Sequence, residues 1–165
     1  MKMELIQPFI NAADAVLAEN LQCSTRIADV AMEEEAYRKK GIAAMVLIRG
    51  EIEGRVIFDM DSPVALKMAS VLAGGEVPEG DSIVRETVCE MANQVIGNAI
   101  TSLNDQGFRF KIFPPEVHTN AEGLKGSEDI EALVMCFETP AGSVYMNIAM
   151  HYNRRRRGER LPAGA

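Results

Sequence analysis

Residues 81–105, with the sequence DSIVRETVCEMANQVIGNAITSLND, give the strongest indication of the fold. At about 100° per residue, apolar side chains recur on one side of this stretch, as they do in an amphipathic helix packed on a core. The members of this stripe are Val84, Val88, Met91, Val95 and Ala99, flanked by Ala92 and Leu103. The stretch therefore predicts one long helix with a single buried face, which Asp81 could cap.

The opposite side of this helix carries residues that folding alone does not require. Glu86, Glu90, Asn93 and Gly97 fall within a narrow arc there. Asn is a poor helix former, and Gly costs roughly 1 kcal/mol relative to Ala in a helix interior. Glu90 and Asn93 are three positions apart, so their side chains emerge one turn apart on the same face. A carboxylate in such a pair can bind a cation while the neighbouring amide orients a water.

Two interpretations of this face remain open from the residues alone. Gly97 removes side-chain bulk where another surface could approach closely, which favours a docking site. A solvated face with an incidental Asn and a Gly chosen for helix packing would give the same pattern, because E-x-x-N is common by chance.

The run Glu90-Met-Ala-Asn93-Gln-Val-Ile-Gly97-Asn98-Ala99 resembles the E-x-x-N…G-N-A signature of the CheC/CheX/FliY phosphatases, which act on the phosphorylated chemotaxis response regulator. It is most similar to CheX. The resemblance extends to element order over roughly residues 1–152, with Pro114 and Pro115 about twenty residues beyond the Asn. Many members have Asp or Ser four residues before the Glu, where this chain has Glu86, a difference that bears on docking.

The resemblance implies a phosphatase that accelerates hydrolysis of the aspartyl phosphate on a CheY-like receiver domain. Glu90 would dock to the receiver's Lys, and Asn93 would position the attacking water. Gly97 and Glu86 would be partner-binding positions, the first keeping the helix face low and the second making a peripheral contact. The other two signature residues, Asn98 and Ala99, would turn towards the buried side and pack there.

The same resemblance bears on cofactors and partners. This chain would bind no cofactor or metal of its own, since the receiver brings Mg²⁺ and a Lys to the phosphate. The alternative function is a non-catalytic receiver-binding or scaffold module of the flagellar-switch type, which would bind in a phosphate-dependent way without speeding dephosphorylation. CheX-like proteins form dimers through a joined sheet, so a homodimer by sheet pairing is expected, and the strand-rich second half could supply the edge.

The composition of the chain argues against several other classes of protein. The chain has 165 residues, 47% apolar and 25% charged, as expected for one globular domain. Its net charge of −7 argues against nucleic acid as the main partner. Three widely spaced cysteines and two isolated histidines predict neither disulfides nor a zinc site. No signal peptide or membrane span is predicted, so we expect a cytoplasmic protein.

The first half predicts a helix, three strands and a second helix. These elements span residues 4–21, 24–32, 42–49, 54–60 and 63–72. Pro8 suits the first turn of the first helix, and Asp61 followed by Pro63 is a helix-start signal. The inward-facing residues of the second helix are predicted to be Val64, Met68, Val71 and Leu72.

The second half predicts the long helix and three strands. Residues 108–113 alternate as a strand that Pro114 and Pro115 end or force to an edge. After a polar loop at 120–129, residues 130–138 and 143–152 form a hairpin.

The two halves thus repeat one order, a helix followed by three strands, with an extra helix closing the first. The predicted fold is α+β, with helices packed on one face of a largely antiparallel sheet, in a single CheX-like domain over residues 1–152. Residues 153–165, with four arginines from Arg154 to Arg157, predict a basic, flexible tail. We expect no membrane or nucleic-acid role for it.

Overall fold

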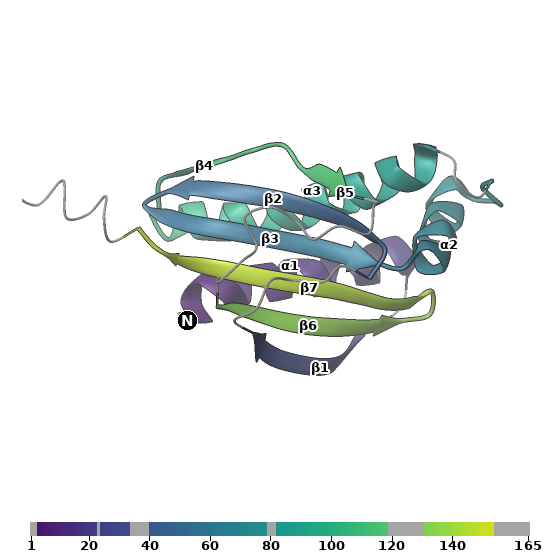
Figure 1. Cartoon of the computed structure of the whole chain (residues 1–165), viewed down its shortest axis with the longest axis horizontal. Coiled ribbons are helices and arrows are strands. Elements are labelled where there is room, and N and C mark those ends of the chain that lie inside the picture. The colour runs from purple at the N-terminus through teal and green to yellow at the C-terminus, as the bar shows by residue number, and fades with distance from the viewer. Residues whose placement is uncertain (1–2, 23, 34–39, 79–81, 119–130, 154–165) are drawn as a thin grey trace, which may run out of the picture.

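The computed structural model describes residues 3–22, 24–33, 40–78, 82–118 and 131–153 (Figure 1). The helices in these residues are α1 (Met3–Leu21), α2 (Ser62–Ala73) and α3 (Ser82–Asp105). The strands are β1 (Arg26–Glu33), β2 (Ile42–Gly50), β3 (Ile52–Met60), β4 (Phe110–Ile112), β5 (Glu116–His118), β6 (Ala132–Thr139) and β7 (Gly142–Tyr152).

All of these strands lie in one antiparallel sheet, in the order β1-β6-β7-β3-β2-β4, with β5 also pairing with β2. The first strand of each half pairs with the other half: β1 lies beside β6, and β4 and β5 lie beside β2. The last strands of the halves, β3 and β7, meet at the centre. The predicted repeat of a helix and three strands is present, with β4 and β5 together in the place of one strand.

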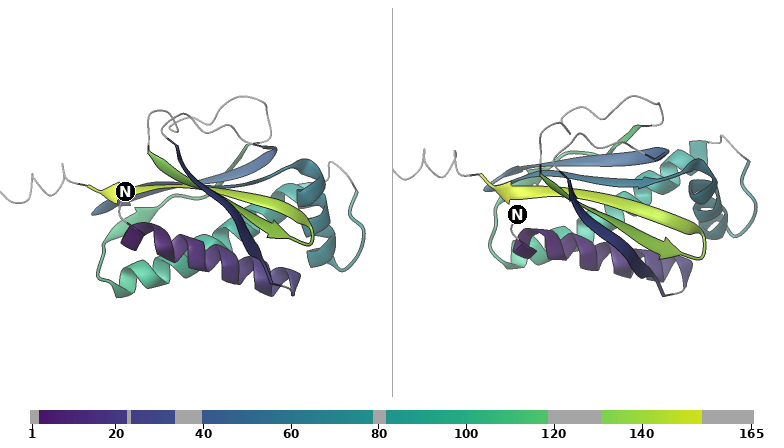
Figure 2. Two further views of the ribbon diagram at one scale, coloured as in Figure 1. Left: turned by 90° about the horizontal axis from the view of Figure 1, so that it is seen from below. Right: turned by 60° about the horizontal axis from the view of Figure 1, so that its bottom comes forward.

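The helices cover one face of the sheet (Figure 2), which confirms the predicted α+β class. α1 contributes buried apolar side chains that include Leu5, Phe9 and Leu17. α3 buries all seven residues predicted for its stripe, and Ile96 as well. Burying a Val, Leu or Ile side chain contributes roughly 1.5–3 kcal/mol, so the stripe fixes which face of α3 remains outside.

Helix α2 begins as predicted but buries less than predicted. The Asp61 carboxylate accepts a hydrogen bond from the Val64 N–H at 2.9 Å, and Gly74 ends the helix in the left-handed conformation. Val64 and Met68 are buried, but Val71 and Leu72 are 52% and 41% exposed. Their predicted inward orientation is wrong because none of the residues that the structure describes covers this last turn, although its periodicity continues the buried stripe.

The strand predicted at 108–113 is shorter, and a second short strand follows it. β4 pairs with one end of β2 and β5 with the other end. Between them, Pro114 and Pro115 interrupt the ladder, because proline has no N–H to donate. The sequence prediction missed β5, whose three residues are too few to show an alternation.

Strands β2 and β3 are buried along most of their length, as their apolar runs predicted. β3 starts two residues earlier than predicted, so Gly54 lies inside the strand. Its φ is +153°, and a Cβ built there would lie 1.8 Å from the carbonyl oxygen of Ala149 in β7. Only glycine allows the two central strands to approach this closely.

Several boundaries differ from the prediction. Pro8 lies inside α1 rather than in its first turn, because the helix begins at Met3. Asn153, predicted to begin the tail, is hydrogen bonded to the β2–β3 turn through the carbonyls of Glu51 and Gly50. Asp81, the loop at 120–129 and the tail at 154–165 lie outside the described residues.

Candidate active site

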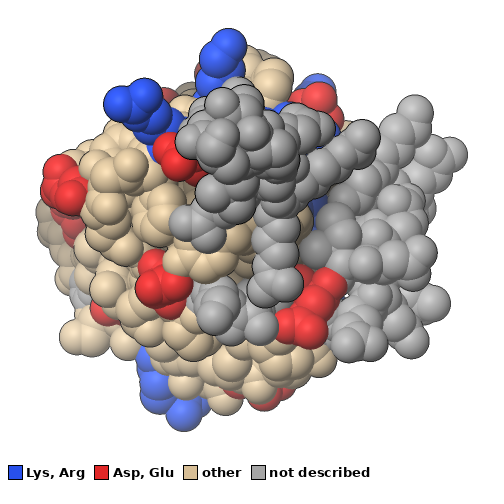
Figure 3. Space-filling view, turned by 90° about the vertical axis from the view of Figure 1, so that its left-hand side faces the viewer, with Lys and Arg blue, Asp and Glu red and all other residues tan. Residues whose placement is uncertain are grey.

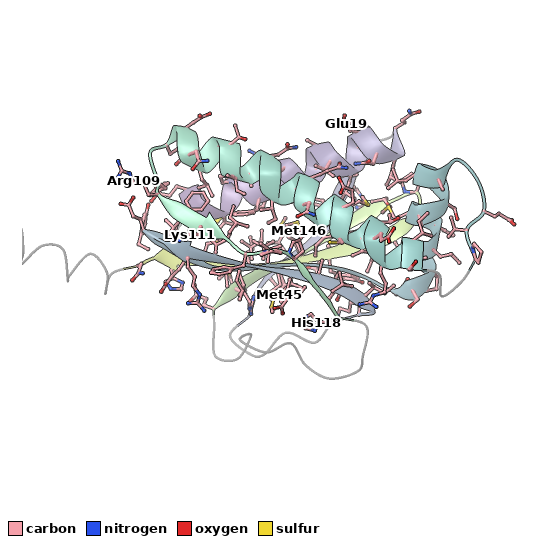
Figure 4. All side chains as sticks on the ribbon, turned by 90° about the horizontal axis from the view of Figure 1, so that it is seen from above. Glu19, Met45, Arg109, Lys111, His118 and Met146 are labelled. Carbon is pink, nitrogen blue, oxygen red and sulfur yellow. The ribbon has the colours of Figure 1, made fainter. Side chains whose placement is uncertain are left out.

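The four residues predicted for the site share the outer side of α3, and we call them the α3 face: Glu86, Glu90, Asn93 and Gly97. All four are exposed, on the side of the helix opposite the buried stripe. At 1.5 Å per residue, the α3 face extends for about 16 Å along the helix axis. α3 lies beside α1 in the layer of helices that covers one face of the sheet (Figure 4). The structure therefore brings the predicted residues together on one open surface.

Glu90 is held by a neighbour on its own helix. Its Oε1 accepts a hydrogen bond from Gln94 Nε2 at 3.5 Å. Gln94 Oε1 accepts one from Asn20 Nδ2, in α1, at 3.0 Å. Neither Gln94 nor Asn20 was predicted as a site residue. The four-residue spacing of Glu90 and Gln94 is visible in the sequence, whereas Asn20 lies 74 positions from Gln94 and leaves no local signal.

The Asn93 side chain makes no hydrogen bond to any other residue that the structure describes. Its amide is exposed, so water satisfies it and no desolvation cost arises. The remaining cost is the poor helix propensity of Asn at an interior position, up to about 0.7 kcal/mol relative to Ala. No contact within the described chain compensates this cost, so the amide is available to a partner or a water.

Gly97 is equally unexplained by the chain's own packing. Apart from the adjacent residues and the nearby backbone of α3 itself, a Cβ built at this position would have no atom within 4 Å. A Gly that permits close helix packing would show such a contact, so the packing interpretation left open by the sequence does not hold here. The Gly97 carbonyl also accepts a hydrogen bond from Thr101 Oγ1 at 3.1 Å. Packing among the described residues therefore gives no reason for a glycine at this position.

The flanks of the α3 face differ partly from the prediction. Glu86 is exposed and forms no ion pair with another described residue. Ala99 is buried, 1% exposed, as predicted for a packing residue. Asn98 is exposed instead, because each residue turns the helix by about 100° and places it between the α3 face and the buried side. Its predicted packing role is wrong.

Other catalytic chemistry has little support in the described part of the chain. It contains no group of three or more His, Cys, Asp or Glu residues that could hold a metal ion. His118 and His151 lie on strands, near Glu116 and Glu53 respectively. Cys89 and Cys136 are free thiols, and Cys23 lies outside the described residues.

A groove in the surface lies away from the α3 face. A groove of about 670 Å³ adjoins the end of α2 and is lined by residues that include Leu66, Val71 and Val77, none of them on the α3 face. At one end of the molecule the described acidic and basic side chains are interspersed (Figure 3). None of the described helices is both long and apolar enough to span a bilayer. An open, convex helix face is suited to a protein partner rather than to an enclosed small substrate.

Comparison with protein families finds a match to the family described as chemotaxis phosphatase CheX, over residues 42–138. This segment includes all of the α3 face. The CheY-P phosphatase CheX of Thermotoga maritima is 31% identical to this chain over 77 residues. The match covers 46% of this chain and 50% of that protein, so the chain spans about half the length of the curated relative.

Two solved structures show the same fold. A CheC-like superfamily protein from Shewanella sp. PV-4 has a TM-score of 0.81 and 20% identity, covering 92% of this chain and 99% of that one. CheX from Borrelia burgdorferi, solved in a CheX–CheY–BeF3–Mg²⁺ complex, has a TM-score of 0.70 and 32% identity. That match covers 88% of this chain and 97% of the other.

Proposed function

Because the chain belongs to the CheX family of chemotaxis phosphatases, we propose that it accelerates hydrolysis of the aspartyl phosphate on a CheY-like receiver domain. The observation that carries this proposal is the α3 face. It presents a carboxylate, an amide and a glycine side by side on a rigid helix, and its own chain explains neither Asn93 nor Gly97. Receiver domains act in the cytoplasm, which is where we place this protein.

In this proposal the receiver supplies the groups that bind the phosphate. The aspartyl phosphate, its Mg²⁺ and a conserved Lys all belong to the receiver, and this chain binds no cofactor. Phosphoryl transfer depends on in-line geometry and charge neutralisation. The α3 face therefore has to add orientation, and well-positioned groups can lower a barrier by several kcal/mol without covalent chemistry.

Glu90 and Asn93 would divide this task. The Glu90 carboxylate would pair with the receiver's Lys and set the register of the complex. Asn93, about 4.5 Å further along the helix axis, would then reach the acyl phosphate and hold a water in line with phosphorus. Glu90 is a poor candidate for a general base, because a carboxylate paired with Lys is weakly basic.

Gly97 and Glu86 would shape the docking surface on either side of this pair. With no side chain at Gly97, the receiver's surface can approach the α3 backbone one turn beyond Asn93. Glu86, one turn before Glu90, would make a peripheral contact. Both residues act on affinity rather than on the chemical step, so their substitution should change KM more than kcat.

The proposal is tested by following phosphate release from a purified, phosphorylated CheY-like receiver with Mg²⁺ present. The protein should accelerate release, and Glu90→Ala should raise KM roughly 30-fold, since truncating one partner of a buried ion pair costs about 2 kcal/mol or more. Asp105→Ala is the matched control, because it removes an exposed carboxylate from the same helix, about 22 Å away along its axis. Phosphate-dependent binding with no faster release would identify a receiver-binding scaffold instead.

A homodimer by sheet pairing is part of the same proposal, through the edge strand β1. β6 and β7 lie inside the sheet. Among its described residues, the second half therefore has only the short strands β4 and β5 at an edge. β1 is eight residues long and exposes Ile27, Val30 and Met32, at 44%, 51% and 52%. A long apolar edge is an open template for another strand. Val30→Lys should lower the mass measured by light scattering to that of a monomer, and an unchanged dimer mass would refute the assignment to β1.

A further inference from the structure

The hydrogen bonds around Glu90 form a continuous chain that links α3 to α1. Starting from α1, Asn20 Nδ2 donates to the Val16 carbonyl at 2.8 Å and to Gln94 Oε1 at 3.0 Å. Gln94 Nε2 then donates to Glu90 Oε1 at 3.5 Å. We call Asn20 and Gln94 the amide relay. Both are half-buried where the two helices meet, whereas Glu90 is exposed.

The chemistry at the two ends fixes the direction of every bond in the relay. A backbone carbonyl can only accept, so Asn20 must present its NH2 group to Val16. The same NH2 group faces Gln94, which must therefore present its oxygen to Asn20. This orientation places the Gln94 NH2 group towards Glu90, whose ionised carboxylate can only accept. Both amides are thus used in the one arrangement that satisfies all the groups.

The hydrogen bond from Gln94 favours one orientation of the Glu90 carboxylate. A free Glu side chain samples many rotamers, and ordering them on binding opposes affinity. Glu90 has no cationic partner among the described residues, so Gln94 is its only described hydrogen-bond donor. Because Gln94 is anchored in turn to α1, the position of Glu90 depends on a residue outside its own helix.

We infer that Gln94 and Asn20 are positioning residues that hold the Glu90 carboxylate ready for a cationic group of the docking partner. This inference rests on the proposed function, in which that group is the receiver's Lys. It concerns affinity rather than chemistry, because neither amide lies on the α3 face beside Asn93. Loss of the relay should therefore raise KM and leave kcat nearly unchanged.

Two substitutions at Gln94 separate its two hydrogen bonds. Gln94→Met keeps the length of the side chain and removes both bonds, and we expect a roughly 3- to 10-fold higher KM for the phosphorylated receiver. Gln94→Glu keeps the acceptor that Asn20 requires but sets a second carboxylate one turn from Glu90, a repulsive spacing on a helix. It should raise KM more than Gln94→Met does. An effect of Gln94→Glu smaller than that of Gln94→Met would overturn the inference.

A matched control and a double variant complete the experiment. Gln7→Met removes a similar glutamine, which donates to Asn11 on the exposed side of α1 at 2.9 Å, and should leave KM unchanged. In a Glu90→Ala background, Gln94→Met should have no further effect, since the relay acts only through Glu90. An equal effect of Gln94→Met with and without Glu90 would overturn the inference.

These measurements distinguish a refuted amide relay from a refuted proposed function. If Glu90→Ala raises KM while Gln94→Met and Asn20→Ala do not, only the relay is refuted. If Glu90→Ala leaves KM unchanged, the docking role of Glu90 is refuted, and the relay with it. Unfolding midpoints of all variants, measured by circular dichroism, should stay within a few degrees of the parent.

Discussion

Gly97→Ala should make the protein more stable and a weaker binder of its receiver. Gly in a helix interior is about 1 kcal/mol less favourable than Ala. Beyond the adjacent residues and the nearby backbone of α3, the new Cβ would have no atom within 4 Å, so no steric cost offsets that gain. For a chain of this length, 1 kcal/mol corresponds to a melting temperature about 2–4 °C higher.

The same methyl group should impair docking. If the receiver's surface packs directly on Gly97, overpacking the contact costs about 1–3 kcal/mol, which is roughly a 5-fold or larger rise in KM. Thermal unfolding and steady-state phosphate release, measured on one protein preparation, give both quantities. The expected rise in stability and loss of affinity distinguish this effect from general damage, because a damaged protein loses stability and activity together.

Ser102→Ala is the matched control for this experiment. Ser102 is exposed on the same helix, five positions further on and therefore about 140° around from Gly97. Its replacement should also stabilise, by a few tenths of a kcal/mol, without changing KM. A Gly97→Ala variant with the parent's KM would refute the assignment of Gly97 to the docking surface, and a less stable variant would refute its freedom from internal contacts.

Three further predictions concern the fold. Gly54→Ala should destabilise severely or prevent folding, because its Cβ would lie 1.8 Å from the Ala149 carbonyl oxygen; soluble, parent-like unfolding would contradict the close approach of the central strands. Asp61→Ala should cost about 1 kcal/mol in urea denaturation through loss of the α2 N-cap, and an unchanged midpoint would count against that cap. Val71→Ser should stay within about 0.5 kcal/mol of the parent while Met68→Ala costs about 2–5 kcal/mol, and equal losses would mean that the last turn of α2 is covered.

Periodicity made the arrangement of α3 predictable from the sequence. In a helix of 24 residues, buried positions recur on every turn, so one misplaced residue does not obscure the pattern. The outer face follows once the stripe is fixed, which is why Glu90, Asn93 and Gly97 were placed correctly together. Asn98, between the two sides, was misplaced because periodicity decides least for residues at the boundary.

Features that depend on distant parts of the chain were not predictable. The exposure of Val71 follows from where the neighbouring elements end, and its own helix carries no sign of this. β5 exists because β2 offers a free side to pair with, and its three residues have no strand pattern of their own. Asn20 meets Gln94 only because α1 packs on α3, so the amide relay required the structure.

The rate of phosphate release at saturating phosphorylated receiver, compared between the parent and Asn93→Ala, tests the role of the α3 face most directly. Ala is the better helix former, so the variant should be at least as stable as the parent and should still bind the receiver. If Asn93 positions the attacking water, the accelerated rate falls to that of the receiver alone. An Asn93→Ala variant that releases phosphate as fast as the parent would show that the amide has no part in the reaction.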